Sequence, residues 1–186
     1  MSLRQTLESA DQLDYAVRLQ GINADNVRQI SADQNEPQRM LDFRLHSLEI
    51  FQKMNFPSRG PSLDTLDLDE IVYYARPASD SRGYAQDRDA VDPTIKEKFA
   101  RLGIPEAEQK YLAGAGGQMD SENVYHKIKE KRAKLGVIFE DMPTALQKFP
   151  DLVQKYFMKL VPPHDHKFAA LHGAVRSGGT FIFVPE

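Results

Sequence analysis

Short stretches of apolar residues at helical spacing, separated by proline and glycine, limit this 186-residue chain to short elements of secondary structure. The longest such stretch is 36–54. Four of its large apolar side chains fall on one helix face: Leu41, Leu45, Leu48 and Phe51. Asn35 and Pro37 are residue types that begin helices, as a cap and in the first turn. We therefore expect a long amphipathic helix here.

The same spacing predicts seven further helical segments, over residues 23–32, 92–103, 105–114, 120–136, 141–149, 150–160 and 165–176. Their expected N-caps include Asn23, Asp120, Asp141 and Asp165. Runs of β-branched and aromatic residues predict short strands over 71–74, 137–139 and 180–184. The predicted fold class is therefore mainly α with a few short strands, an α+β chain.

Composition along the chain predicts its domain organisation. Residues 1–20 are polar and weakly patterned, so we expect them to be loosely ordered. Residues 21–176 form one predicted helical domain. Within it, residues 76–91 contain almost nothing apolar, and a segment that buries so little surface is expected to be mobile. Residues 177–186 form a separate last unit.

Composition also excludes several classes of function. Cysteine is absent, so these residues alone hold no disulfide, thiolate zinc site or thiolate-ligated iron–sulfur cluster. The 24 basic and 27 acidic side chains nearly balance, which leaves no electrostatic footprint for nucleic acid. No apolar run approaches the roughly 20 residues of a membrane-spanning helix, and the N-terminus lacks a signal-peptide core. A cytoplasmic protein is the simplest interpretation.

Three histidines near the C-terminus are the candidates for a metal site: His164, His166 and His172. The first two could present paired imidazoles to a metal ion, with the third completing the set. The alternative is structural, a polar linker followed by a helix that Asp165 caps. His172 lies on the expected apolar face of that helix, beside Phe168, Leu171 and Val175, which favours a buried core histidine.

Two further motifs have simpler explanations than a ligand site. The acidic cluster Asp64, Asp67, Asp69 and Glu70 lacks the glycine of a calcium loop and predicts a capped, solvated turn. Gly114–Gly117 could cradle a phosphate, but it lacks the ending of a P-loop and predicts a flexible connection instead. No Gly-x-Ser-x-Gly nucleophile motif is present. We expect no enzyme, and no catalytic or cofactor-binding residues in this chain.

An ordered set of short motifs runs through nearly the whole chain. The motifs are NEP at 35–37, ML at 40–41, FRL at 43–45, LEIF at 48–51, DEIVYY at 69–74, LGIPEAE at 102–108, KYLAG at 110–114, DSE at 120–122, VYH at 124–126, GVIF at 136–139, FPDLV at 149–153, VPP at 161–163, KFAAL at 167–171 and SGGTFI at 177–182. Each is weak alone, but in number and order the motifs specifically resemble the SufB family, the scaffold proteins of the SUF machinery for iron–sulfur cluster assembly.

The resemblance implies a fold and partners. SufB proteins are similar to SufD, and both associate with the SufC ATPase. Their core is a right-handed parallel β-helix preceded by a helical region; this chain resembles that region, so residues 177–186 would begin a truncated β-helix core. The family's cluster-assembly residues and SufC-binding segment would lie beyond residue 186. The chain departs from the family pattern at its three C-terminal histidines, where asparagines are common, at Gly117, and at Arg176, where an aromatic is usual.

We therefore expect the N-terminal part of a SufB-like scaffold, non-catalytic and without cluster ligands, whose partners SufC and SufD bind mainly through polypeptide beyond this chain. The alternatives are a stand-alone protein-interaction module and, less favoured, a metal- or nucleotide-binding enzyme. The last strand carries the predicted interaction residues: Phe181, Ile182, Phe183 and Val184. A strand without neighbours exposes unpaired backbone groups, so we expect it to be disordered or to pair with another molecule, including a second copy.

Overall fold

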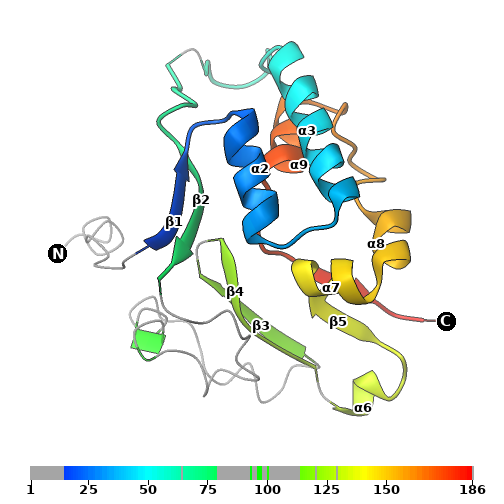
Figure 1. The fold of residues 1–186 in the computed structure, drawn as a ribbon. Coiled ribbons are helices and arrows are strands. Elements are labelled where there is room, and N and C mark those ends of the chain that lie inside the picture. Colours follow the sequence, from blue (N-terminus) through cyan, green and yellow to red (C-terminus); the bar gives the residue numbers. More distant parts are fainter. Residues whose placement is uncertain are drawn as a thin grey trace.

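The computed structural model describes residues 15–63, 65–78, 114–119, 121–128 and 130–185, with isolated positions between 93 and 100. The helices and strands in these residues are β1 (Tyr15–Gln20), α2 (Ala24–Asp33), α3 (Gln38–Lys53), β2 (Val72–Pro77), β3 (Gly114–Met119), β4 (Glu122–Ile128), α6 (Glu130–Ala133), β5 (Ile138–Asp141), α7 (Met142–Lys148), α8 (Pro150–Tyr156), α9 (Lys167–Val175) and β6 (Thr180–Phe183). The strands form three separate antiparallel pairs, and α2 and α9 both contact α3 (Figure 1). The fold class is α+β, with more strands than predicted.

The first two helices form where the sequence predicts them because their signals are local. Asn23 caps α2, since its side-chain oxygen accepts a hydrogen bond from the Asn26 backbone N–H at 2.9 Å. Asn35 does not cap α3. Its φ of +51° places it in the turn after α2, and α3 follows Pro37. Asparagine adopts this left-handed conformation more readily than most residues, which explains why Asn35 lies in the turn and does not cap α3.

The core between the helices depends on small side chains of α9. Its buried residues are Val27, Leu48, Phe51, Ala170 and Ala174. Gly173 lets α9 approach α3 closely, because a Cβ there would lie 2.6 Å from Oγ of Ser47. The face of α9 that is buried is therefore its alanine and glycine face. The predicted inward stripe of Phe168, Leu171 and Val175 is only half-buried.

The segment expected to be loosely ordered contains a strand. Residues 15–20 form β1, which pairs with β2. Leu19 and Tyr74 from this sheet are buried together with Ile30 of α2. The expectation for residues 1–20 is thus wrong over 15–20, because Val17 and Leu19 alternate and pack once β2 and α2 lie beside them.

A hairpin stands where the sequence predicts a flexible loop and a helix. β3 pairs with β4 from Gly114↔Ile128 to Met119↔Glu122, so the glycine-rich loop is a strand. Among the described residues of the predicted helix over 120–136, only those of α6 are helical. Val124 and Ile128 are spaced to suit either one helix face or one strand face, so the pattern alone did not distinguish them.

The final strand pairs within the chain. β6 is antiparallel to β5, from Ile138↔Phe183 to Asp141↔Thr180. The Met142 backbone N–H also donates to the Gly179 carbonyl at 3.1 Å. The expectation that this strand is disordered is therefore wrong, because β5 supplies its neighbour. Pairing of its other edge with another molecule stays a prediction. Self-association of the chain stays a prediction.

The C-terminal helices begin close to their predicted starts. Oδ1 of Asp141 caps α7 by accepting from the Thr144 backbone N–H at 2.9 Å. Pro150 opens α8, which ends at Tyr156, earlier than predicted. Met158, with φ of +47°, lies in the loop that follows. α9 is capped by His166 and not by Asp165.

Several predictions concern residues that the structure leaves undescribed. The expected helices over 92–103 and 105–114 lie almost wholly outside the described residues, as does the expected mobile segment beyond residue 78; residues 76 and 77 end β2. In the part of the chain that is described, no helix has the length and apolar character needed to cross a membrane.

Candidate functional site

The candidate histidines lie in or just before α9, and His166 has a structural role. Its Nδ1 accepts a hydrogen bond from the Ala169 backbone N–H at 3.1 Å, which caps the helix. A neutral imidazole has one acceptor nitrogen, so the cap uses the lone pair that a metal ion would need. His164 is exposed. Among the described side chains, no three His, Asp or Glu residues are grouped to hold a metal ion.

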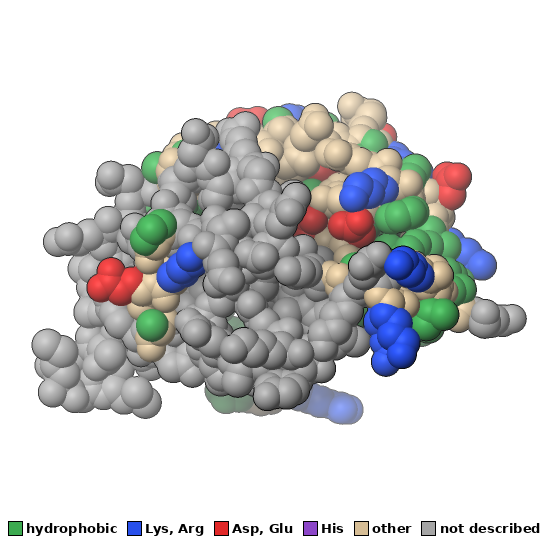
Figure 2. All heavy atoms as spheres, turned by 90° about the horizontal axis from the view of Figure 1, so that it is seen from below, with side chains coloured by type: hydrophobic (Ala, Val, Ile, Leu, Met, Phe, Trp, Pro, Cys, Tyr) green, Lys and Arg blue, Asp and Glu red, His purple; other side chains and the backbone are tan. Residues whose placement is uncertain are grey.

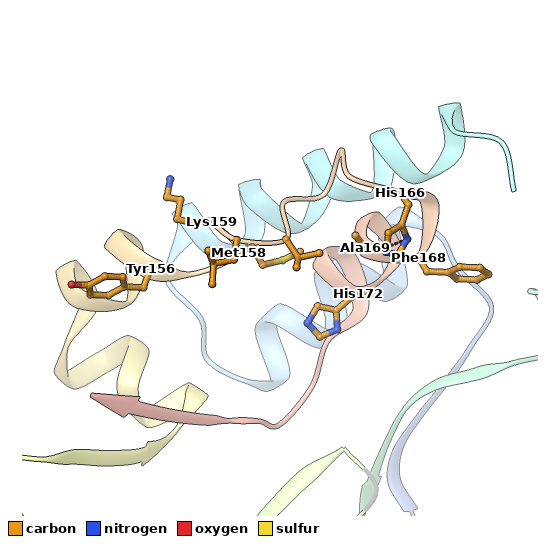
Figure 3. A pocket seen from close by; sticks show the side chains of 9 residues that line it. Tyr156, Met158, Lys159, His166, Phe168, Ala169 and His172 are labelled. Atoms are coloured by element: carbon orange, nitrogen blue, oxygen red, sulfur yellow. Dashed lines mark hydrogen bonds between the residues drawn. The ribbon is translucent and has the colours of Figure 1, made fainter. Parts of the chain in front are cut away.

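His172 lies on the exposed side of α9, not in the core as predicted. It lines a hollow of about 380 Å³ between the end of α8 and α9. Figure 3 shows Tyr156 at one end of this hollow and Phe168 at the other. Partial burial, followed by the positive charges of Arg176 and Arg44, lowers the pKa of His172. The neutral imidazole is therefore favoured.

A buried ion cluster of Glu36, Arg44 and Arg176 holds α3 to α9. The Glu36 carboxylate accepts from Arg44 Nε at 2.6 Å and Nη2 at 2.8 Å, and from Arg176 Nη2 at 2.8 Å. The Glu36 and Arg44 side chains are fully buried. Arg44 Nη1 also donates to the Ala174 carbonyl at 2.9 Å, near the end of α9. Because buried charges are stable only with their partners in place, the cluster fixes how the two helices meet.

Arg176 is less fully satisfied than Arg44. Its guanidinium carbon lies 4.9 Å from the centre of the Phe157 ring. Its Nε and Nη1 are buried and have no hydrogen-bond acceptor among the described residues. Burial and then repulsion from Arg44 lower its pKa to about 10, against the raising effect of Glu36. The cluster thus carries two positive charges for one negative charge at neutral pH.

A further buried cation, Lys167, joins the start of α9 to the end of α3. Its Nζ donates to the Phe51 carbonyl at 2.8 Å and to the Met54 carbonyl at 2.7 Å. It also lies 4.3 Å from the centre of the Phe51 ring and 4.9 Å from that of Phe56. A cation is favoured at these carbonyls by the helix dipole. Sequence reasoning missed this lysine because no local pattern separates it from a solvated one.

Large apolar side chains stay exposed along α8, the loop after it and the end of β6. The α8–β6 surface comprises Tyr156, Leu160, Val161, Ile182 and Val184, which are 48, 98, 52, 59 and 67% exposed. Tyr156 lies between the part of this surface formed by the loop after α8 and the part formed by β6. It lines the 380 Å³ hollow with Leu160 and Val161, and a second hollow of about 260 Å³ with Ile182.

The predicted interaction residues are therefore divided between two faces. Ile182 and Val184 are exposed, whereas Phe181 is buried and Phe183 is half-buried, as alternation along a strand requires. Figure 2 shows hydrophobic side chains gathered, with Lys and Arg side chains among them, on the side of the molecule that carries α7, α8 and the C-terminus (right in Figures 1 and 2).

The weaker motifs have structural roles. Oδ1 of Asp67 accepts from the Asp69 backbone N–H at 2.9 Å, which is the capped turn predicted for the acidic cluster. Asp64 lies outside the described residues. Gly114–Gly117 use their backbone in pairing with β4, not in a phosphate-binding loop.

Comparison with known proteins identifies the relationship of the chain. Residues 117–186 match the family model described as the SufBD protein N-terminal region. The chain is 48% identical over 166 residues to the iron–sulfur cluster assembly protein SufB of Bacillus subtilis (strain 168). The aligned residues make up 89% of this chain and 35% of that protein. An iron–sulfur cluster assembly SufBD family protein of Staphylococcus aureus (strain USA300) matches with the same identity and coverage.

The chain spans about a third of the length of these relatives. Their names and the matched region confirm the resemblance read from the sequence motifs. The chain is therefore similar over 89% of its length to iron–sulfur cluster assembly proteins of the SufBD family, and its residues 117–186 match the N-terminal region of that family.

Proposed function

We propose that this chain serves iron–sulfur cluster assembly as the N-terminal, non-catalytic part of a SufB-like scaffold and supplies no ligand to the cluster. The observation that carries the proposal is the 48% identity to Bacillus subtilis SufB over 89% of the chain. The proposed location is the cytoplasm. The proposed partners are SufC and SufD, with contacts mainly in polypeptide beyond these residues.

The chemistry of the side chains supports a cluster held elsewhere, as the cargo of a longer scaffold. Cysteine thiolates are the usual ligands of iron–sulfur clusters, and the chain has none. The acceptor nitrogen of His166 is engaged in the helix cap. The buried carboxylate of Glu36 is bound by two arginines. None of these groups is free to replace a thiolate.

The proposed contribution of this region is to hold a rigid unit in a defined orientation. The ion cluster holds the C-terminal end of α9 at two points. Arg44 donates to the Ala174 carbonyl in the last turn, and Arg176, which follows the helix, donates to Glu36. Residues 177–179 follow directly and lead into β6. The position of β6, and of any polypeptide that continues from it, is thereby coupled to the buried contacts between α3 and α9.

Reconstitution of the purified chain tests the absence of ligands. We would incubate it anaerobically with ferrous iron, sulfide and a thiol reductant, and then desalt it. We expect no iron–sulfur absorption band and no stoichiometric iron in the protein fraction. Stoichiometric iron that is retained by the chain and lost in a His166→Ala/His172→Ala variant would contradict the proposal, because those imidazoles would then be ligands.

The reading frame downstream of codon 186 tests the scaffold assignment. An open frame that extends to the length of the relatives would support it. A native stop codon at that point would favour the stand-alone interaction module instead, and co-purification with SufC and SufD would then be measured on the 186-residue chain.

A further inference from the structure

We propose that the buried ion cluster of Glu36, Arg44 and Arg176 binds a small inorganic anion of halide size beside the guanidinium of Arg176. The anion would accept a hydrogen bond from Nε or Nη1, the two nitrogen atoms of that guanidinium that Glu36 does not contact. This inference goes beyond the proposed function and does not depend on it, because it concerns only the contacts that hold α3 to α9.

Arg176 has buried hydrogen-bond donors without partners. Its side chain is only 5% exposed, and its Nη2 donates to the Glu36 carboxylate at 2.8 Å. Its Nε and Nη1 are buried as well, but they have no acceptor among the described residues. A buried donor without an acceptor keeps the whole cost of its removal from water. An acceptor taken from solution is therefore favoured beside this guanidinium.

The cluster also carries more positive than negative charge. Both arginines are bonded to the Glu36 carboxylate, and in the described residues no second carboxylate is bonded to either of them. Burial, and then repulsion from Arg44, lowers the pKa of Arg176 to about 10, which still leaves the guanidinium charged at neutral pH. A water molecule would accept a hydrogen bond but leave the surplus charge in place. An anion would accept the bond and also balance the charge, because Coulomb attraction is strong where water is excluded.

The surroundings of Arg176 limit the size of the anion. The hollows of about 380 and 260 Å³ at the α8–β6 surface do not have Arg176 in their walls, and neither does one of about 230 Å³ between α3 and α8. The Phe157 ring lies against the guanidinium, with its centre 4.9 Å from the guanidinium carbon. A halide ion takes about as much space as a water molecule, whereas a phosphate or an organic acid needs an open pocket. The site would therefore hold a single halide ion.

His172 lies close enough to the cluster to report on its charge. Partial burial, and then the positive charges of Arg176 and Arg44, lower the pKa of His172. An anion beside Arg176 would offset part of that positive charge and so raise the pKa of His172 toward its ordinary value. The imidazole therefore gives a measure of anion binding that is separate from stability.

Thermal unfolding of the 186-residue chain tests the proposal. The melting temperature is measured in sodium chloride and in sodium gluconate at the same ionic strength, because gluconate is too large for the site. We expect chloride to raise the melting temperature by about 2–4 °C relative to gluconate, since a ligand that binds only the folded chain stabilises it. The difference should disappear in Arg176→Met. It should persist in Arg28→Met, the matched control at an arginine whose side chain is 54% exposed.

Two further measurements do not rely on stability. In a crystal of the chain grown with bromide, we expect an anomalous-scattering peak in hydrogen-bond contact with Nε or Nη1 of Arg176. In an NMR titration, the pKa of His172 should be higher in chloride than in gluconate, because the bound anion offsets the charges of Arg176 and Arg44. Arg176→Met should remove that difference. A purely structural role of Arg176 would produce neither result.

Equal melting temperatures in the two salts would overturn the proposal, because water would then be the acceptor. A chloride effect of the same size in Arg176→Met would also overturn it, since the effect would belong to another part of the chain. A bromide peak with no change in the melting temperature or in the pKa of His172 would indicate an adventitious ion only, and the proposal would fail. None of these results bears on iron or sulfide binding, so this inference and the proposed function can fail separately.

Discussion

The interface between α3 and α9 and the α8–β6 surface differ in which side chains find partners. Between the helices, even charged groups are buried, because Glu36 binds two arginines and Lys167 binds two carbonyls. At the α8–β6 surface, Leu160 and Val184 stay in water although they are apolar. In the first region, the contacts between the helices give most of the buried charges a partner, whereas the second region leaves apolar area in water.

Substitution of Glu36 should have the largest effect on stability. Glu36→Gln leaves two buried arginines without a counter-charge, so we expect the free energy of unfolding to fall by about 3–5 kcal/mol, which is enough to unfold a marginal chain. Urea denaturation followed by circular dichroism measures it. The control is Asp25→Asn, which removes an exposed 3.0 Å pair with Arg28 and should change stability by less than about 0.5 kcal/mol.

The two arginines of the cluster sharpen this test. Arg176→Met should destabilise far less than Glu36→Gln, because two of the Arg176 donors lack acceptors among the described residues and its charge is repelled by Arg44. A loss for Glu36→Gln no greater than for Asp25→Asn would show that the cluster does not hold the helices together.

Gly173→Ala should have an intermediate effect. The added Cβ would lie 2.6 Å from Oγ and 2.9 Å from Cβ of Ser47, so α9 must move away from α3. We expect a loss of about 1–3 kcal/mol in the free energy of unfolding, the usual range for overpacking. Combining it with Ser47→Gly should recover part of the loss. An unchanged denaturation midpoint in Gly173→Ala would contradict the close helix approach.

The pH dependence of His172 should be the smallest effect. Its pKa is lowered in the folded protein, so the unfolded chain binds the proton first, near its ordinary value of about 6.5. Stability should therefore decline as the pH falls below about 6.5 and level off below the folded-state pKa. His172→Gln should reduce this decline between pH 7.5 and 5.5 in urea denaturation. A steeper decline in the variant would show that the folded protein raises the pKa of His172 instead of lowering it.

Elements with signals inside a few residues could be predicted. Asn23 and Asp141 cap their helices as expected, because each cap reaches only three residues ahead. Helix α9 was predicted, but its cap was assigned to Asp165 when His166 performs it. Imidazole nitrogen is a rarer cap than carboxylate, and the two residues are adjacent, so local pattern favoured the wrong one.

Features that depend on distant partners could not be predicted. The spacing of Val124 and Ile128 suits a helix, but in the structure this segment is a strand because it pairs with β3. Glu36 and Arg44 lie in motifs recognised in the sequence, yet nothing there indicates that Arg176 joins them. Likewise the pattern of β6 showed a strand, but its partner β5 lies far earlier in the chain.

The resemblance to a known family, the positions of α2, α3, α7, α8 and α9, and the lack of thiolate ligands follow from the order and type of residues alone, because each is carried by contiguous motifs or by composition. The burial of Glu36 between two arginines, the alanine and glycine face of α9, and the exposed side chains that form the α8–β6 surface required the folded chain. These features depend on which segments meet in space, and on the desolvation of charge that their meeting imposes.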